Sequence, residues 1–408
     1  MNEESLVSVL REQVERLYRM DFYKNKLDQA RIRPSDIRSM EDFRKVPFTH
    51  SPEFIEELLK EPSNCSLYSE DVTRVNFSPS GSQLYPVYQT NADIKRMNEV
   101  SARSFEAAGV KKSDLCAVTF GYHLFIAGIF YQTQLEYYGA KVIPLGPGES
   151  ERARKIINHY RVSVLISNPT FAMKLAAADG IPSVRILFVG GEPFTSVDGY
   201  ADRVRATFGR DLTIIDSYGM AACSPLARSC RYGTGLHVMD DFVFAEVIDP
   251  ETGENVPYGE KGELVITHLY KEAAPLLRYR TGDLTIMERK ECKCGRDITL
   301  PKGVFGRTDE MLKVKGVKFW PSQVGTILST FPECSNRYRV VVSCRKGVDV
   351  LELVVEGSNA MRDRIDELSV RLKQETLIAF NTITVVPNLE QGPIMVDKRK
   401  GNQDISFI

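Results

Sequence analysis

Four residues have the types and the spacing of a metal site. Cys230 and His237 are separated by six residues, and Cys292 and Cys294 follow as a Cys-x-Cys pair within the turn sequence KECKCGR. Three thiolates and one imidazole form a closed tetrahedral set for a structural Zn²⁺ ion, with no open position for catalysis. We therefore expect structural zinc here, the alternative being unrelated thiols and a core histidine.

The other cysteines lack such spacing. We expect buried thiols at Cys65, Cys116, Cys223, Cys334 and Cys344. The N-terminal sequence MNEESLVSVLREQVERL is acidic and amphipathic, and with eight cysteines it indicates a cytoplasmic location with reduced thiols. A zinc hydrolase or deaminase needs an open metal position and a general base, and the four residues offer neither. A zinc-dependent hydrolase or deaminase is therefore a much weaker interpretation than a structural zinc site.

Composition and charge exclude several further classes. Of the 408 residues, 43% are hydrophobic and 26% are charged, which is typical of a soluble globular protein. Lys plus Arg (53) nearly balance Asp plus Glu (54), so no overall field attracts nucleic acid or an anionic membrane. The most apolar stretch, residues 117–131, is too short to span a bilayer. We expect neither nucleic acid nor a membrane as partner.

The middle of the chain alternates strand-like and helix-like segments. Between residues 73 and 219, apolar runs such as LCAVTF, VSVLIS and VRILFVGG are separated by amphipathic stretches such as SERARKIINHY. This alternation predicts an α/β fold with a mostly parallel, doubly wound sheet. Ligands bind at the carboxyl ends of the strands in such sheets, so we expect the site there.

The second half of the chain has a different pattern. The segment FVFAEVIDPETGENVPYGEKGELVITHL predicts an antiparallel sheet or a distorted, barrel-like subdomain. The last hundred residues, with RYRVVVSC, VLELVVEG and a helix from about Asn359 to Glu375, predict a small α+β domain. We predict an N-terminal domain at 1–307, with the zinc-bearing antiparallel subdomain at about 220–307, and a mobile C-terminal domain at 308–408.

Several segments, in the right order, resemble the adenylate-forming superfamily of acyl-CoA synthetases and adenylation domains, and more closely its phenylacetate-CoA ligase branch. The most specific are GELVITHLYKEAAPLLRYRTGDL at 262–284 and GRTDEMLKVKGVKFWPSQV at 306–324. VGGEP, DSYGM and a Ser/Gly loop are weaker matches. The resemblance spans roughly residue 73 to the C-terminus.

The Ser/Gly loop SPSGSQLYP resembles the family's phosphate-binding loop at Ser80, Gly81 and Ser82. Hydroxyl groups and a flexible glycine let backbone N–H groups converge on a phosphate. The family usually has Gly and Lys where this chain has Leu84 and Tyr85, so a cation is missing. A plain polar turn is the alternative interpretation.

Two further motifs follow apolar strands and should lie side by side at the sheet edge. The resemblance implies an adenine-binding pocket lined by Gly191, Glu192, Pro193, Asp216, Ser217, Tyr218 and Gly219. Glycines permit close approach of the ring, and a tyrosine offers a face for stacking. The family's second motif normally continues to a magnesium-binding Glu, whereas this chain has Ala222.

Charged residues of the later motifs acquire roles from the same resemblance. Asp283 would accept the ribose hydroxyls, Arg307 would reach the ribose and phosphates, and Asp309 would be the hinge of the C-terminal domain. Lys398, with Lys400 as the fallback, matches the mobile catalytic lysine that contacts the substrate carboxylate and α-phosphate. A solvated basic tail is the alternative for the KRK run.

The segment FGYHLFIAGIF resembles the aromatic-rich helix start that lines the aryl group in the phenylacetate branch. Our candidates for the acyl pocket are Tyr122, Phe125, Ala127, Gly128, Gly190 and Ala221. Aromatic walls and small residues suit a flat aryl carboxylate, although aromatic residues in an apolar stretch also build ordinary cores.

The resemblance implies an AMP-forming acid–thiol ligase. Such an enzyme would use ATP and Mg²⁺ to convert a small carboxylic acid, preferably aromatic, to an acyl-adenylate. It would then transfer the acyl group to coenzyme A or a carrier-protein thiol. The alternative is a degenerate, non-catalytic homologue that binds an acyl or nucleotide ligand or a partner enzyme. The oligomeric state stays open, and a homodimer is compatible with the sequence.

Overall fold

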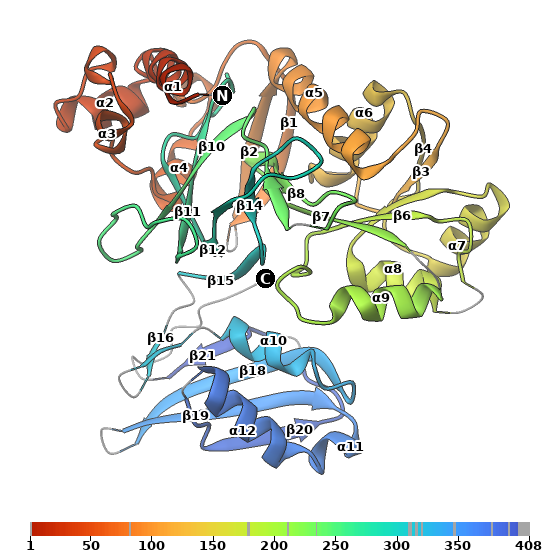
Figure 1. Cartoon of the computed structure of the whole chain (residues 1–408). Coiled ribbons are helices and arrows are strands. Elements are labelled where there is room, and N and C mark those ends of the chain that lie inside the picture. The colour runs from red at the N-terminus through yellow and green to blue at the C-terminus, as the bar shows by residue number, and fades with distance from the viewer. Residues whose placement is uncertain are drawn as a thin grey trace. The chain divides into compact units, whose positions relative to one another are not determined.

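Two units make up the chain in the computed structural model (Figure 1). The first comprises Met1–Phe194, Arg203–Thr281 and Thr285–Gly303, and the second comprises Thr195–Asp202, Gly282–Leu284 and Val304–Ile408. The structure describes residues 2–80, 83–177, 180–209, 212–233, 235–308, 312–314, 317–319, 321–345, 348–376, 378–390 and 392–398.

The chain begins with the helices α1 (Glu3–Leu17), α2 (Asp21–Gln29), α3 (Met40–Arg44) and α4 (Ser51–Leu58). They pack on a segment far along the sequence. The Gln13 side chain donates to the carbonyl of Lys271 (3.1 Å), and the Tyr23 hydroxyl donates to that of Pro275 (2.6 Å). The backbone N–H of Thr49 donates to the carbonyl of Arg278 (3.0 Å). These bonds fix the helical segment to residues 271–278.

A hairpin of β1 (Val72–Ser80) and β2 (Gln83–Thr90) leads into α5 (Asn91–Ala108). The described residues of the predicted Ser/Gly loop therefore lie on two paired strands, Ser78 to Ser80 on β1 and Gln83 to Pro86 on β2. Thr90 and Asp93 form a reciprocal capping box at the start of α5, which satisfies backbone donors that a helix N-terminus otherwise leaves free.

The predicted parallel strands form as expected. They are β3 (Leu115–Val118), β4 (Lys141–Pro144), β5 (Val164–Ser167), β6 (Ile186–Gly190) and β7 (Thr213–Met220), in the spatial order β7-β6-β5-β3-β4. The connecting helices are α6 (Ala127–Tyr138), α7 (Ser150–His159), α8 (Pro169–Ala176) and α9 (Tyr200–Phe208). Helices α5 and α6 cover one face, and α8 and α9 the other (Figure 1). The doubly wound α/β prediction is confirmed.

The sheet continues beyond its parallel part. The strands β8 (Cys223–Arg228), β9 (Leu236–Val238), β14 (Ile298–Leu300) and β13 (Glu288–Arg289) extend it antiparallel, giving the order β13-β14-β9-β8-β7-β6-β5-β3-β4. The chain reverses at residues 221–222, so that Ser217 pairs with Arg228 across β7 and β8. Part of the segment expected in a separate antiparallel subdomain thus belongs to the main sheet.

The remaining antiparallel strands form a second sheet. Its order is β10 (Val243–Ile248), β11 (Lys261–His268), β12 (Tyr279–Ile286) and β15 (Val304–Arg307). Val243 pairs with His268, as the alternating sequence predicts. The described strands leave this sheet open, so it is antiparallel but not a closed barrel.

A buried ion pair connects this sheet to the N-terminal helices. The guanidinium of Arg278 donates to both carboxylate oxygens of Glu246 (3.1 Å each) and to the carbonyl of Val46 (2.8 Å). The side chains of Arg278 and Glu246 are only 3% and 2% exposed. Removal of one partner leaves the other charge buried and unpaired.

We expect Glu246→Ala to lower the free energy of unfolding by about 3–5 kcal/mol, as measured by urea denaturation. Arg152→Ala is the control, because the Arg152–Glu149 pair is 72% and 68% exposed. Its loss should change stability by at most about 0.5 kcal/mol. Equal effects of the two substitutions would contradict this prediction.

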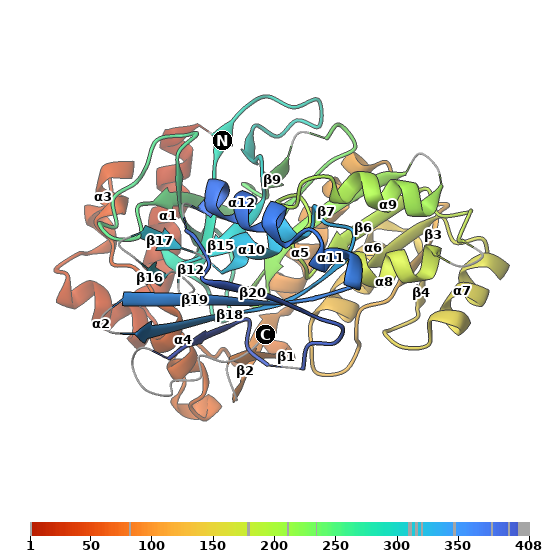
Figure 2. The ribbon, with the colours of Figure 1, turned by 90° about the horizontal axis from the view of Figure 1, so that it is seen from below.

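The second unit carries its own core. Its sheet has the order β20 (Thr382–Val386), β19 (Val348–Gly357), β18 (Cys334–Arg345), β21 (Met395–Asp397), and a small hairpin pairs β16 (Leu312–Val314) with β17 (Val317–Phe319). Helix α10 (Ser322–Leu328) contacts β18 and α12 (Ile365–Thr376). Both helices lie on one face of the sheet (Figure 2). The expected single helix is divided, because α11 (Asn359–Arg362) ends before α12 begins.

No helix in the described part of the chain is both long enough and apolar enough to cross a membrane.

Candidate active site and metal cluster

A cavity of about 200 Å³ lies in the first unit at the carboxyl ends of the parallel strands. Walls come from β1, the loop before α6, the ends of β6 and β7, and β8. It is lined by Phe77, Ser78, Phe120, Phe125, Ile126, Ala127, Phe130, Tyr131, Gly190, Gly191, Ser217, Tyr218, Gly219, Met220, Ala221, Ser224, Pro225 and Arg228. Aromatic rings form much of the wall, and polar groups are few.

The structure gathers four of the six acyl-pocket candidates at this cavity: Phe125, Ala127, Gly190 and Ala221. Tyr122 and Gly128 are not among its lining residues. Gly128 instead packs against the preceding loop, where an added Cβ would come within 2.3 Å of the carbonyl oxygen of Gly121. Burial raises the pKa of Tyr122 to about 12, so its hydroxyl stays protonated at neutral pH.

The two adenine-motif segments lie side by side. Gly190 at the end of β6 pairs with Ser217 of β7, and a Cβ on Gly190 would approach the Ser217 carbonyl oxygen to 2.9 Å. Gly191 has φ +79°, a conformation that glycine adopts without strain. Gly191, Ser217, Tyr218 and Gly219 line the cavity.

The other members of these motifs occupy different positions. Glu192 accepts a hydrogen bond from the Thr170 hydroxyl at 2.6 Å, which ties the turn after β6 to α8. Asp216 is 7% exposed, and its backbone N–H donates to the Ser229 hydroxyl at 2.8 Å. Pro193 is exposed in the same turn as Glu192. None of these three lines the cavity.

The hairpin of β1 and β2 shows what replaces the missing cation. Tyr85 is buried, and its side chain is hydrogen-bonded to that of Ser78, a cavity residue. Leu84 is exposed. Ser80 ends β1, where its backbone pairs with Gln83, whereas Gly81 and Ser82 lie outside the described residues.

The second unit carries the charged candidates. Arg307 of β15 donates to the Asp283 carboxylate of β12 at 2.8 Å. The Lys398 side chain is exposed, while its backbone N–H donates to the Val342 carbonyl at 2.7 Å and so anchors the chain beside β18. Asp309 and Lys400 lie outside the described residues.

Cys230, His237, Cys292 and Cys294 converge in the first unit, with their ligand atoms all within 4.8 Å of one another. Cys230 follows β8, His237 lies on β9, and the two other cysteines lie in the turn between β13 and β14. Because His237 pairs with both Arg228 and Thr299, the pairing of β9 brings the distant segments together.

The spacing within this cluster fits a tetrahedral zinc site. Zn–S and Zn–N bonds of standard length require S···S and S···N separations of about 3.8 and 3.5 Å. The sulfur of Cys230 lies 3.7 Å from that of Cys292 and 3.4 Å from Nε2 of His237. Burial, assisted by Arg296, lowers the pKa of His237 to about 4, so its imidazole is neutral and can act as a ligand.

Two thiols of this cluster are protonated at neutral pH unless a metal ion is bound, whereas other cysteines of the chain lie outside it. Burial raises the pKa of Cys230, and that of Cys294 to about 12. A bound cation would favour their thiolate forms. Cys65, Cys116 and Cys223 are buried as predicted, but Cys334 is half-buried, and the side chain of Cys344 is outside the described set.

Several cavity residues were not predicted from the sequence. Phe120, Ile126 and Phe130 lie within the segment FGYHLFIAGIF but were not named as candidates, Tyr131 follows that segment on α6, and Phe77 lies on β1. Arg228 lies at the end of β8. The apolar run around Pro225 was the available signal for a buried strand.

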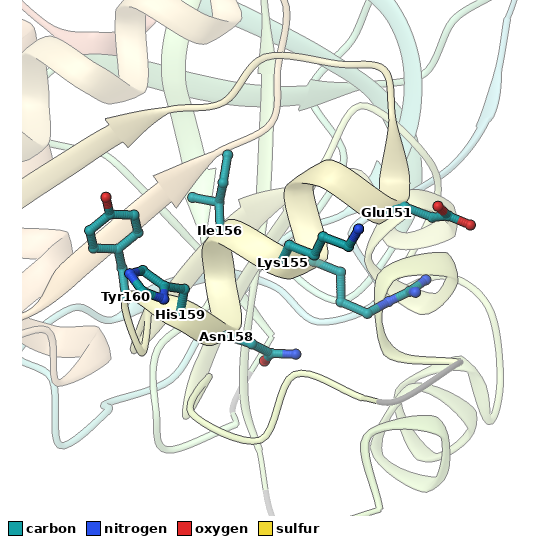
Figure 3. A pocket seen from close by; sticks show the side chains of 7 residues that line it. Glu151, Lys155, Ile156, Asn158, His159 and Tyr160 are labelled. Atoms are coloured by element: carbon teal, nitrogen blue, oxygen red, sulfur yellow. The ribbon is translucent and has the colours of Figure 1, made fainter.

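A larger surface depression, of about 750 Å³, lies elsewhere (Figure 3). Its walls are Glu151, Arg154, Lys155, Ile156, Asn158, His159 and Tyr160. All belong to α7 or the residue after it, and Figure 3 shows their side chains spreading from that single helix. Because this depression is lined by side chains of one helix only, whereas the smaller cavity is lined by several strands and a helix, we place the candidate active site at the smaller cavity.

Comparisons with known proteins agree with this architecture. Residues 94–269 match the model of the AMP-binding enzyme family, and residues 316–392 match that of the AMP-binding enzyme C-terminal domain. The chain is thus an AMP-forming, adenylate-forming enzyme by family, as the motifs predicted.

Its relatives define the branch. The chain is 34% identical to phenylacetate-coenzyme A ligase of Thermus thermophilus, covering 87% of this chain and 83% of the relative. It is 31% identical to the Escherichia coli phenylacetate-coenzyme A ligase, over 82% and 77% of the two chains. The chain belongs to the adenylate-forming superfamily, in its phenylacetate-CoA ligase-like branch.

Solved structures share the fold. The crystal structure of a 2-hydroxyisobutyryl-CoA ligase in the postadenylation state superposes with a TM-score of 0.86 at 24% identity, covering 98% of this chain and 90% of that one. An anthranilate CoA ligase in complex with anthranoyl-AMP gives a TM-score of 0.57 at 17% identity, over 79% and 65%.

Proposed function

We propose that the protein activates a small carboxylic acid with ATP and joins it to coenzyme A. Membership of the acid–CoA ligase family, combined with an aromatic-walled cavity at the carboxyl ends of β6 and β7, carries this proposal. A carboxylate oxygen attacks the α-phosphorus and pyrophosphate leaves. The coenzyme A sulfur, after losing its proton, then attacks the acyl carbon, and AMP leaves.

The residue roles in this proposal follow the motifs. Gly191 and Tyr218 would hold the adenine, Asp283 would accept the ribose hydroxyls, and Arg307 would orient Asp283 through their ion pair. Lys398 would stabilise the charge that builds on the α-phosphate and carboxylate. Rotation of residues 308–408 about Asp309 would exchange the groups that face the two half-reactions.

The acid proposed is small and preferably aromatic. Phe125, Phe130 and Tyr131 give the cavity flat apolar walls, and Ala127 and Ala221 leave room between them. The volume of about 200 Å³ limits the acid to a compact molecule. A carrier-protein thiol as acceptor, a homodimer and a cytoplasmic location also remain proposals.

We propose that the four-residue cluster holds structural Zn²⁺. Its donor set and its spacing of 3.7 and 3.4 Å support this, and four protein ligands leave no position for substrate. The metal would connect the end of β8, strand β9 and the turn before β14. The residues would thereby stabilise the antiparallel extension of the main sheet rather than take part in the reaction.

Magnesium has weaker support from the protein. Ala222, where the family has a carboxylate, is half-buried in the turn between β7 and β8 and offers no ligand. Phosphate oxygens and water would supply the Mg²⁺ ligands instead. This substitution and the buried Tyr85 are the observations that favour the second candidate function, a non-catalytic homologue that binds an acyl or nucleotide ligand.

Restoring the carboxylate separates the two functions. We expect Ala222→Glu to raise the adenylation rate at limiting Mg²⁺ by about tenfold or more. Ala222→Gln is the matched control, because it has the same size and no charge, and it should give no gain. If Ala222→Glu also gives no gain, the site has been repurposed and the non-catalytic function is favoured.

The direct test is acid-dependent exchange of labelled pyrophosphate into ATP, across aryl and short aliphatic acids. This assay reports the first half-reaction without the thiol. Exchange with at least one acid is expected. Its absence with every acid, using folded protein, would rule out the ligase function.

A further inference from the structure

Arg228 is a buried cation in the wall of the acyl cavity. It is 2% exposed at the end of β8, and it lines the cavity together with Phe130 and Tyr131 of α6. Basic residues are almost never fully buried unless a partner compensates the charge.

The groups around Arg228 are neutral. Its two terminal nitrogens donate to the Ser104 hydroxyl (2.8 Å) and to the Gln134 side-chain carbonyl (3.2 Å). The rings of Phe105, Phe130 and Tyr131 lie 5.2, 5.7 and 5.1 Å from the guanidinium carbon. The Tyr131 side chain is also hydrogen-bonded to the guanidinium. No carboxylate in the described part of the chain pairs with Arg228, and Nε has no hydrogen-bond partner there.

The charge persists despite this environment. Burial lowers the pKa of Arg228, but a guanidinium remains protonated at neutral pH. Hydroxyl, amide and aromatic groups compensate only part of the lost hydration, because none of them carries a full negative charge. The cavity therefore has a positive wall that an anion would neutralise.

A second unsatisfied polar group adjoins it. Ser217 pairs directly with Arg228 across β7 and β8 and also lines the cavity. Its hydroxyl oxygen is buried and has no hydrogen-bond partner among the described residues. One carboxylate could accept from both the Ser217 hydroxyl and the free Nε of Arg228, which satisfies both donors.

We propose that Arg228 is a specificity residue that binds a second anionic group on the acid, so that the preferred substrate is a small dicarboxylate. This inference rests on the proposed ligase function. The reacting carboxylate would lie toward Gly191 and Gly219, and the second carboxylate toward Arg228 and Ser217. Phe130 and Tyr131 would enclose the carbon skeleton between them.

Wild-type protein provides the first test, by pyrophosphate exchange with matched acids. The acids are 3- and 4-carboxybenzoate, their half methyl esters and benzoate, so that shape is retained while the second charge is removed. We expect kcat/KM for at least one dicarboxylate to exceed that for its half ester by about 100-fold or more. Preference for the half esters or benzoate would overturn the inference and leave the ligase function intact.

Arg228→Met provides the second test, with Arg231→Met as the control, since Arg231 is exposed. We expect Arg228→Met to abolish the preference for dicarboxylates, with the KM for ATP unchanged. An equal loss with all acids and a raised KM for ATP would assign Arg228 to the nucleotide and overturn the proposal. Should the variant not fold, the wild-type ratio decides alone. Absence of exchange with any acid overturns both the ligase function and this inference.

Discussion

Lys398→Ala should reduce pyrophosphate exchange by about 100- to 1,000-fold, because a cation directed at charge developing in the transition state contributes on this scale. The structure makes this substitution a clean one. The side chain is exposed, and the residue is held through its backbone N–H bond to Val342, which alanine retains. Loss of exchange should therefore occur with an unchanged thermal midpoint.

Lys373→Ala is the control for this prediction. Lys373 is also exposed and lies on α12 of the same unit, so its removal changes the net charge by the same amount. Its exchange activity should match that of the wild type. If Lys398→Ala also retains full activity, the catalytic lysine lies elsewhere in the final segment, and Lys400→Ala becomes the decisive variant.

Removal of the metal should have the second large effect. We expect about one zinc ion per chain by elemental analysis, and a fall of roughly 10 °C in the thermal midpoint after chelation. The physical reason is that the cluster joins the end of β8 and strand β9 to a turn some sixty residues later in the chain. Arg296 of that turn also bonds to Val238, Asp240 and Asp241, so the turn is weakened rather than released when the metal is lost.

Cys292→Ser should reproduce this destabilisation, because it removes one thiolate from the set. Cys334→Ser is the matched control, since Cys334 is a half-buried thiol outside the cluster. It should leave both the zinc content and the response to chelator unchanged. Full zinc occupancy in Cys292→Ser, or no zinc in the wild type, would contradict the proposed site.

The sequence predicted the parallel sheet well because its inner strands β3, β5 and β6 are buried on both faces. Segments such as Val164–Ser167 and Ile186–Gly190 are continuous apolar runs with every residue buried, and helical stretches separate them. The long motifs then identified the family. These signals come from residues that are close together in the chain, so they can be recognised from the sequence without the three-dimensional structure.

The features of the fold and the cavity that the sequence did not predict depend on contacts between residues far apart in the chain. Strands β13 and β14 have only two and three residues, and β14 joins the main sheet by pairing with β9 some sixty residues earlier. Arg228 shows the same limit at the cavity. Its neighbours Ser104 and Gln134 are 124 and 94 residues away, so no local pattern revealed that they surround one buried charge.

The docking of the N-terminal helices onto a distant segment determines when they can complete their native contacts during synthesis. Their partners lie 228, 252 and 258 residues later in the chain, at Leu277, Pro275 and Lys271. At typical translation rates, those partners leave the ribosome roughly 10–50 s after the helices do. During that interval α1 can pack on α3 and on residues 34–36, but the groups of the helical segment that bond to residues 271–277 lack those partners. The first segment made is therefore among the last to complete its native contacts, although it leaves the ribosome first.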